Sequence, residues 1–261
     1  MIVIKFGGHA MTDEHGQFAQ SIAKAIAEGV HPVIVHGGGP QIAAALKEAQ
    51  IESAFVGGFR VTTPESYQVV ERVLTQEVGP SVAQSFQSHG VNAVALSARS
   101  EKILVAQVLN HLVDGTPVDL GLVGEVISVN TEKIESTVSQ GFIPVIAPVA
   151  ENADGSGGLN VNADLAAAAI AGALDAQWLI IMTDVPGIYR NWPDSDSLIS
   201  HISANELASL KASFSEGMAP KVQACLDAIG AGAKAVRIID GTNPTALESA
   251  LLGVGGTLVM A

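Results

Sequence analysis

Short apolar, β-branched runs that end directly in glycine clusters recur along this chain. Residues 2–6 lead into Gly7-Gly8, and residues 32–35 lead through His36 into Gly37-Gly38-Gly39 and a helical pattern. Such runs are typical of buried strands, and glycine lets a backbone approach an anion without a Cβ in the way. The N–H groups that open a helix point at that anion with the favourable end of the helix dipole. The pattern therefore predicts an α/β protein that binds phosphate.

Strand-like runs alternate with helical patterns almost to the end of the 261 residues, which predicts a mainly parallel sheet with helices on both faces, a three-layer αβα sandwich. We expect one domain of two lobes that share the sheet, residues 1–174 and 175–261. Strands are expected at residues 2–6, 32–35, 91–96, 143–147, 178–182, 236–239 and 256–260. Helices are expected around 18–26, from Thr62 or Thr63 to near Gly90, at 131–140, from Asn162 or Asp164 to 174, from Ser203, and from Pro220 to Gly230. Residues 103–130 predict antiparallel hairpins, and residues 151–158 and 183–196 predict loops.

The composition excludes several classes of protein. A net charge of −13 disfavours broad binding to nucleic acid or to an anionic membrane, because both are attracted by positive potential. Cys225 is the single cysteine, so a disulfide framework is impossible. No apolar run approaches the ~20 residues of a membrane helix, and the chain enters a strand at once. We therefore expect a cytoplasmic protein.

Several polar residues lie where the predicted strands end or the predicted helices begin. Lys5 precedes the first glycine pair, where it could neutralise phosphate or pair with an acid as a structural lysine. Lys221 falls in a predicted first helical turn, where it opposes the dipole and so requires a nearby anion. Arg60 could be solvated or could grip a carboxylate, and residues 160–164 could cap a helix or recognise a ligand. Four strand ends carry Gly, Asp, Lys or Thr, and we expect them to line a single cleft.

Familiar nucleotide-binding patterns are mostly absent. Residues 230–235 match G-x-G-x-x-A, but they follow a predicted helix and precede a predicted strand, which is the wrong order for a dinucleotide site. The sequence has no G-x-x-x-x-G-K-[ST] loop and no kinase H-R-D or D-F-G pair. His36 stands at a strand end, where a histidine is more often a hydrogen-bonded structural group than a catalyst, so we assign it no catalytic role.

Taken together, the residues resemble the amino-acid kinase family over essentially the whole chain. The resemblance rests on segments in a specific order and spacing, namely Lys5 to Gly8, Val35 to Ile42, Gly58 to Thr62, Gly121 to Val126, Ile143 to Pro148, Asn160 to Asp164, Thr183 to Gly187, and Pro220-Lys221. It implies the amino-acid kinase fold, with the acceptor and dimerisation in the first lobe and ATP in the second. The implied reaction transfers the γ-phosphoryl of ATP to the side-chain carboxylate of N-acetyl-L-glutamate, a step of arginine biosynthesis. Mg²⁺ would be bound mainly through the nucleotide phosphates, with no metal site built from side chains.

The resemblance also implies a role for each matching residue. Lys5 and Lys221 would stabilise the transferring phosphoryl group, and Asp164 would hold both lysines in position. Gly7, Gly8, Gly37 and Gly38 would bind phosphate or substrate through backbone N–H groups, Arg60 and Asn160 would bind the acetylated amino acid, and Thr183 and Asp184 would lie near the nucleotide. A carboxylate acceptor is already ionised at neutral pH, so the reaction requires no general base.

Some positions differ from the commonest family pattern: His9 follows the first glycine pair, and Thr63 and Ala98-Arg99 also differ. Because the sequence starts at the first strand, we expect a homodimer that arginine does not inhibit.

Two rival functions remain. One is a kinase that acts on aminoadipate or glutamate attached to an acidic carrier protein, which the charge of −13 should repel. The other is a nucleotide-binding sensor that has lost catalysis.

Overall fold

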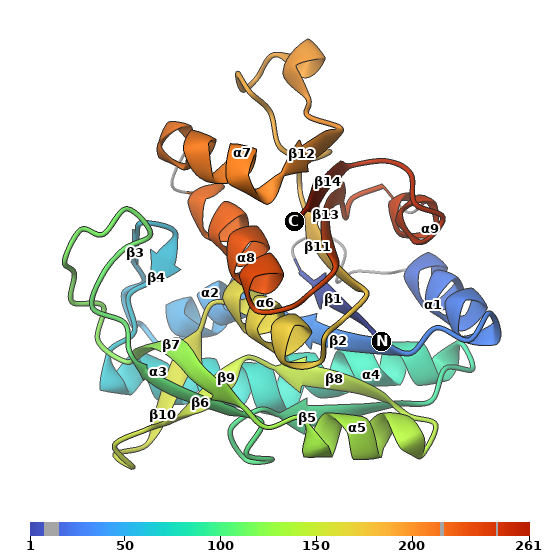
Figure 1. The fold of residues 1–261 in the computed structure, drawn as a ribbon. Helices are drawn as coiled ribbons and strands as arrows, with labels where there is room; N and C mark the ends of the chain where they lie inside the picture. The colour runs from blue at the N-terminus through green and yellow to red at the C-terminus, as the bar shows by residue number, and fades with distance from the viewer. Residues whose placement is uncertain (8–15, 215–216, 244) are drawn as a thin grey trace.

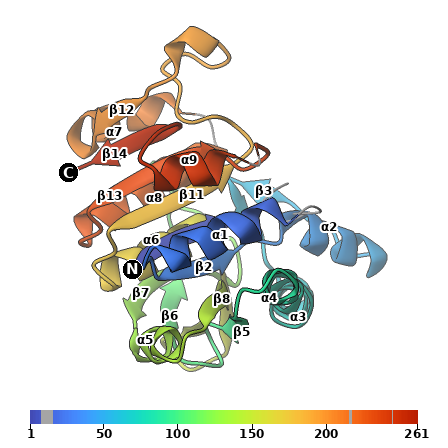
Figure 2. The same ribbon diagram turned by 90° about the vertical axis from the view of Figure 1, so that its right-hand side faces the viewer.

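A computed structural model describes residues 1–7, 16–214, 217–243 and 245–261. Its centre is an eight-stranded sheet in the order β12-β14-β13-β11-β1-β2-β8-β5, with helices on both faces (Figures 1 and 2). All neighbouring strands are parallel except β13 and β14. The predicted three-layer, mainly parallel architecture is confirmed. The strands of this sheet are β1 Ile2–Phe6, β2 Pro32–His36, β5 Ala93–Ser97, β8 Ile143–Ala147, β11 Trp178–Thr183, β12 His201–Ser203, β13 Ala235–Asp240 and β14 Thr257–Met260.

The helices fall into two groups that cover opposite faces of the sheet. The α-helices are α1 Gln17–Ala27, α2 Gly39–Glu48, α3 Pro64–Arg72, α4 Gly79–Ser88, α5 Glu132–Ser139, α6 Ala163–Ala173, α7 Ala204–Leu210, α8 Ala219–Gly230 and α9 Ala246–Leu251. One buried cluster contains apolar side chains of α5, α6, α7 and α8, and the other contains those of α1, α2, α3, α4 and α9. Short 3₁₀ turns lie at Ser195–Ser197 and Lys211–Ser213.

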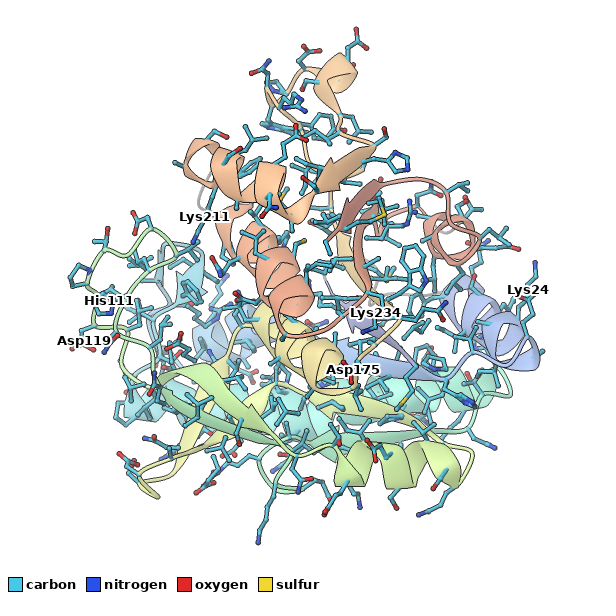
Figure 3. The ribbon with its side chains drawn as sticks, in the orientation of Figure 1. Lys24, His111, Asp119, Asp175, Lys211 and Lys234 are labelled. Carbon is cyan, nitrogen blue, oxygen red and sulfur yellow. The ribbon has the colours of Figure 1, made fainter. Side chains whose placement is uncertain are left out.

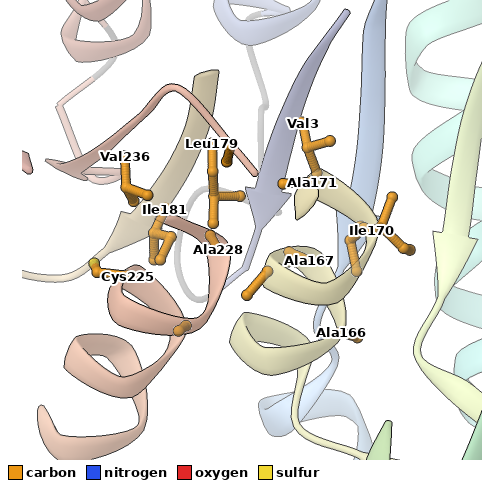
Figure 4. Close-up of a cluster of buried hydrophobic side chains, with 14 of the residues drawn as sticks. Val3, Ala166, Ala167, Ile170, Ala171, Leu179, Ile181, Cys225, Ala228 and Val236 are labelled. Carbon is orange, nitrogen blue, oxygen red and sulfur yellow. The ribbon is translucent and has the colours of Figure 1, made fainter. Parts of the chain in front are cut away.

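Alternation along β1 shows how one strand serves both faces. Val3 is fully buried in the cluster that includes α6 and α8, whereas Ile2 and Ile4 are buried in the opposite cluster. Successive strand side chains point to opposite faces, so a strand covered on both sides needs an unbroken apolar run. Figure 4 shows Val3 and Leu179 packed over the alanine-rich face of α6, where small side chains allow the helix to approach the sheet.

A second, smaller sheet lies beside the main one and differs from the sequence prediction. Strands β6 Leu104–Val108, β7 Val123–Val129, β9 Val149–Asn152 and β10 Gly158–Val161 form a closed four-stranded barrel. In this barrel β6 pairs with β7 and β9 pairs with β10 in antiparallel fashion. The other two pairs, β7 with β10 and β6 with β9, are parallel. The predicted antiparallel pairing within residues 103–130 is therefore confirmed. The predicted loop range of 151–158 is wrong at both ends, because its first residues belong to β9 and its last residue begins β10.

The long helix predicted between residues 62 and 90 is interrupted by a turn of π-helix. Val73–Val78 adopts this wider geometry between α3 and α4. Pro80 supplies a physical reason, because it has no N–H to donate to the carbonyl of Gln76 and its ring crowds that carbonyl. The interruption brings Leu74 to the cleft described below.

The capping residues settle two alternatives left open by the sequence. Thr63, not Thr62, caps α3 by accepting from the Ser66 backbone N–H, with Pro64 in the first turn. Asn162, not Asp164, caps α6 through its side-chain oxygen. Ser203 caps α7 as predicted, accepting from the Glu206 N–H at 3.1 Å. Strand β12, which ends at Ser203, was not predicted.

Exposed ion pairs join elements that lie far apart in the sequence. Lys24 of α1, labelled in Figure 3, lies 2.6 Å from Glu248 of α9, which joins helices on the same face of the sheet. Lys234 and Asp175 lie near one another beyond α8 and α6, with 3.9 Å between charged atoms (Figure 3). None of the helices in the described ranges has the length and apolar character needed to span a lipid bilayer.

Candidate active site

A cleft of about 550 Å³ opens at the carboxyl ends of the parallel strands. Lys5 and Gly7 reach it from β1, residues 37–39 from β2, and residues 182–184 from β11. Three of the expected strand ends therefore meet, as an open α/β sheet predicts. The fourth, Asp240-Gly241 after β13, is not among the described lining residues, although the Gly241 N–H donates to the carbonyl of Thr183, which does line the cleft.

Asp164 lies between two lysine ammonium groups. Lys5 Nζ is 3.1 Å from Asp164 Oδ1, and Lys221 Nζ is 2.9 Å from Asp164 Oδ2. Asp164 is 4% exposed and Lys5 8% exposed, so solvent screens these pairs weakly. Lys5 Nζ also donates to the Met182 carbonyl at 3.3 Å. The structure thus brings together the three residues for which the resemblance implies catalysis.

Local sequence explains why these side chains meet. Lys5 is the penultimate residue of β1 and pairs in register with Val35 and Ile181 of the flanking strands. Asp164 and Lys221 each lie in the first turn of a helix, α6 and α8 respectively. A carboxylate is favourable there and an ammonium is not, so the Asp164 partner offsets the unfavourable position of Lys221. Gly7 leaves room for the ammonium, because a Cβ at this position would lie 2.9 Å from Lys5 Nζ.

The environment shifts the three pKa values in different directions. Burial opposes ionisation of Asp164, but attraction to Lys5 and Lys221 outweighs it and lowers the pKa to about 2. Attraction to Asp164 raises the pKa of Lys221. The pKa of Lys5 is lowered, because burial is the largest influence on that group and the neighbouring Lys221 adds repulsion. The Asp164 carboxylate is therefore ionised throughout the neutral range.

The amino end of α2 forms one wall of the cleft. Gly38 is its N-cap and has no side chain with which to accept from the first-turn N–H groups, so these donors are left for water or a ligand. Gly37 also lines the cleft, but its N–H donates to the Phe6 carbonyl at 2.7 Å and is committed to the backbone. In this structure the Gly37 N–H is therefore not free to donate to a phosphate, and a binding role for Gly37 stays a prediction. Gly8 and His9 lie outside the described residues.

Arg60 also lines the cleft, beside the amino end of α2, and its guanidinium makes three contacts. Its Nη2 donates to the Gly39 carbonyl at 3.2 Å, and its Nη1 donates to the Ser53 hydroxyl. The Phe55 ring lies 4.5 Å from the guanidinium carbon, a distance suited to cation–π attraction. Phe55 pairs with Arg60 across the two-stranded sheet of β3 Phe55–Val56 and β4 Phe59–Arg60. The guanidinium is therefore fixed in direction before any ligand binds.

Asn160, Thr183 and Asp184 complete the predicted set. Asn160 lies in β10, not in a loop, and its Nδ2 donates to the Thr62 hydroxyl at 3.1 Å. Thr183 ends β11, and its hydroxyl donates to Asp184 Oδ1 at 3.1 Å. All three line the same cleft as Lys5 and Lys221.

The cleft carries a local charge opposite to that of the whole chain. Its described charged residues are three cations, Lys5, Arg60 and Lys221, and two anions, Asp164 and Asp184. This net charge of +1 contrasts with −13 for the chain. Anionic ligands are therefore attracted to the cleft in preference to the rest of the surface. Among the residues that the structure describes, no group of three or more His, Cys, Asp or Glu could hold a metal ion.

Sequence reasoning missed Phe55, Ser53 and Leu74 as residues at the site. The Gly57-Gly58 pair between Val56 and Phe59 is a two-residue hairpin signal that would have placed Phe55 opposite Arg60. No local pattern indicates that Leu74 reaches the cleft, because its position depends on the π turn.

Comparison with known proteins supports the same interpretation. Over residues 1–240 the chain matches the amino acid kinase family. The chain belongs to this family. An acetylglutamate kinase of Kineococcus radiotolerans is 44% identical over 270 residues, covering 100% of this chain and 90% of that relative. An acetylglutamate kinase of Arthrobacter sp. strain FB24 is 48% identical over 250 residues, covering 93% of this chain and 81% of that relative.

Solved structures with a similar fold agree with the family assignment. The crystal structure of smu.665 from Streptococcus mutans superposes with a TM-score of 0.83 at 30% identity, covering 100% of this chain and 98% of the other. Carbamate kinase from Giardia lamblia bound to AMP-PNP gives a TM-score of 0.69 at 22% identity, with 99% and 97% covered. At that identity the second likeness shows the fold alone.

Proposed function

We propose that this protein is an acetylglutamate kinase, which transfers the γ-phosphoryl group of ATP to the side-chain carboxylate of N-acetyl-L-glutamate. The products are an acyl phosphate, N-acetyl-L-glutamyl 5-phosphate, and ADP, and the reaction is a step of arginine biosynthesis. The observation that carries the proposal is the ion-paired set of Lys5, Asp164 and Lys221 in one cleft with Arg60 and Asn160. Relatives named acetylglutamate kinase at 44% and 48% identity support the choice of substrate.

The chemistry that this geometry can supply is charge neutralisation. Both reactants are anionic, so their approach is opposed by Coulomb repulsion. Lys5 and Lys221, held on the two oxygens of Asp164, place two ammonium groups near one point of the cleft. A loose phosphoryl transition state requires mainly alignment and such cations, with the first-turn N–H groups of α2 as further donors.

The acceptor carboxylate attacks phosphorus directly. Its oxygen forms the new P–O bond while the bond to the β-γ bridging oxygen breaks, and the electron pair leaves with ADP. No proton is transferred, so no general base is needed. His36 is consistent with this, because it is fully buried, burial lowers its pKa to about 4, and its Nδ1 donates to the Gly37 carbonyl at 2.8 Å.

Acceptor binding is proposed for Arg60 and Asn160, and nucleotide binding for Thr183 and Asp184. A guanidinium suits the α-carboxylate of an amino acid, because its planar donors match two oxygens. An amide can both donate to and accept from the acetamido group. The two sets lie in residues 1–174 and 175–261, which agrees with an acceptor lobe and an ATP lobe.

Magnesium fits this cleft only as a partner of the nucleotide. Both Asp164 oxygens are engaged by lysines, which leaves Asp184 as the carboxylate among the described lining residues without such an ion pair. One carboxylate with phosphate oxygens and water is a usual ligand set for Mg²⁺, which would offset phosphate charge when bound. We also propose a cytoplasmic homodimer, as expected for a biosynthetic enzyme of this kind.

The test is ADP release by the pure protein with N-acetylglutamate as acceptor, beside glutamate, N-acetylaminoadipate, aspartate, carbamate and UMP. We expect N-acetylglutamate to give the highest kcat/KM, with formation of the acyl phosphate trapped as a hydroxamate. Turnover of a carrier-linked glutamate in preference to the free amino acid would favour the first rival. Binding of ATP without turnover of any acceptor would favour a sensor.

A further inference from the structure

Thr62 lies where the hairpin that carries Arg60 meets the small barrel. It is fully buried, and its backbone N–H donates to the Leu120 carbonyl at 2.9 Å. Its carbonyl accepts from the Leu122 N–H at 2.7 Å, so a parallel bridge forms opposite Gly121. The main chain of Thr62 is therefore fixed to the segment that leads into β7.

Close approach at this bridge requires glycine at position 121. Gly121 has a φ of +70°, in the left-handed region, and a Cβ there would lie 2.4 Å from the Thr62 carbonyl oxygen. The main chains at Thr62 and Gly121 are therefore in close contact, which fixes the backbone position from which the Thr62 side chain extends.

The Thr62 hydroxyl makes two hydrogen bonds toward the two candidate acceptor-binding residues. Its Oγ1 lies 2.9 Å from the Arg60 carbonyl, to which it donates. Asn160 Nδ2 lies 3.1 Å from the same oxygen. A hydroxyl has one hydrogen, so the second bond must be accepted. This arrangement assigns the NH₂ end of the Asn160 amide to Thr62 and leaves Asn160 Oδ1 and one Nδ2 hydrogen for other partners.

Arg60 and Asn160 belong to different sheets, which the backbone joins through Leu122, because the Leu122 N–H donates to the Thr62 carbonyl and the Leu122 carbonyl accepts from the Asn160 N–H. Arg60 belongs to the two-stranded sheet of β3 and β4, whereas Asn160 pairs with Val123 and Val149 in the barrel. The Thr62 hydroxyl therefore connects two separate sheets at the point where both present a side chain to the cleft. A buried threonine needs only one hydrogen bond to satisfy its donor, so the second bond acts on Asn160.

We propose that Thr62 is a positioning residue for the acceptor, which orients the Asn160 amide and fixes the Arg60 backbone so that both face the same ligand. This inference rests on the proposed function and adds a residue that touches neither reactant. Its effect is confined to acceptor binding, because the lysines and Asp164 do not depend on Thr62 for any described contact.

Thr62→Val tests the proposal, because valine keeps the shape and removes the hydroxyl. Loss of one oriented hydrogen bond is expected to raise the KM and the Kd for N-acetylglutamate about tenfold, with the KM for ATP unchanged and kcat within about threefold. Thr62→Ser keeps the hydroxyl and should restore most of the affinity. Thr137→Val is the matched control, since Thr137 is also buried but donates only within α5, to the Lys133 carbonyl at 2.7 Å.

A second measurement asks whether Thr62 acts through Asn160. In a double-mutant cycle, Thr62→Val should add little to the loss caused by Asn160→Ala. Full additivity would overturn the proposal, as would unchanged N-acetylglutamate affinity in Thr62→Val or an equal loss in Thr137→Val. If Thr62→Val does not fold, Thr62→Ala replaces it, and failure of both to fold would mean a purely structural role. Wild-type protein that does not phosphorylate N-acetylglutamate would instead refute the proposed function, whatever the variants do.

Discussion

At the scale of single residues, Asp164 determines the organisation of the cleft. With a pKa lowered to about 2 it stays ionised, and each of its oxygens holds one lysine from a different element. Lysine side chains are flexible, so in the proposed reaction this tether would reduce the entropy lost when the two ammonium groups align on phosphate.

Lys221 and Arg60 should therefore affect different kinetic constants. Lys221→Ala is expected to lower kcat about 100-fold or more with little change in KM, because it removes charge from the transition state. Arg60→Ala should mainly raise the KM for N-acetylglutamate, about tenfold or more. Steady-state kinetics with both substrates varied would separate these effects. Lys234→Ala and Arg190→Ala, at exposed ion pairs, are the controls, and the reverse pattern would show that the roles are misassigned.

His36 should make stability depend on pH. Burial lowers its pKa to about 4, whereas the unfolded chain has the ordinary value of 6.5. Between these values the unfolded state binds a proton that the folded state does not, so stability is lost as the pH falls through this window. We expect a loss of about 2 kcal/mol between pH 7 and pH 5, measured by urea unfolding. His36→Gln should flatten this dependence and the exposed His201→Gln should not, and equal slopes in all three proteins would contradict the assignment.

Much of the site could be predicted from the sequence, because its residues follow strand ends and helix starts. Lys5, Asp164, Lys221 and Arg60 all meet in the cleft as expected. Gly37 shows what sequence reasoning could not reach, since the hydrogen bond of its N–H to Phe6 depends on the register of β1 with β2.

At the scale of elements, the π turn between α3 and α4 packs against the amino end of α2. Leu74 from this turn packs on Gly38, where a Cβ would lie 2.7 Å from Leu74 Cδ2. Gly38 has a φ of 179°, an extended conformation open to any residue, so the reason for glycine here is space and not backbone strain.

Gly38→Ala should consequently destabilise the fold through this contact. We expect a cost of about 1–2 kcal/mol by urea unfolding, because Leu74 is buried and has little room to move. Gly39→Ala is the control for stability, since a Cβ there meets no atom within 4 Å. The double variant Gly38→Ala/Leu74→Ala should lose about 1 kcal/mol less stability than the sum of the losses in the two single variants. Simple additivity would show that the two residues do not interact as described.

Elements with a strong hydrophobic period were predicted well, and those that depend on distant partners were not. The buried strands β1, β2, β8 and β11 match their expected ranges closely. In contrast, β9 and β10 are short and contain polar residues such as Asn152 and Asn160, so their strand character comes from barrel closure and not from local preference.

At the scale of the whole molecule, the proposed lobes share one sheet and two continuous cores. The boundary near residue 174 falls between β1 and β11, which pair along four registered positions. Each of the two large buried clusters contains side chains from both sides of that boundary, such as Val3 with Ile181 and Ile4 with Ile180. The division into 1–174 and 175–261, the homodimer and its insensitivity to arginine all stay predictions.

Continuous cores predict a single cooperative unfolding transition. Trp178 and Trp192 both lie beyond residue 174, so tryptophan fluorescence follows that half, whereas far-ultraviolet circular dichroism follows the whole chain. The two urea curves should coincide within error. An earlier transition seen by one probe alone would show that the halves unfold independently.

The engagement of both Asp164 oxygens by lysines has a consequence for fidelity. The Asp164 carboxylate, with its pKa lowered to about 2, is a poor base toward the proton of a water molecule in the cleft, and His36 is fully buried with its pKa lowered to about 4. Only a nucleophile that arrives already ionised can use the two ammonium groups well. When the acceptor is scarce, the enzyme should therefore hold ATP without squandering it in futile hydrolysis.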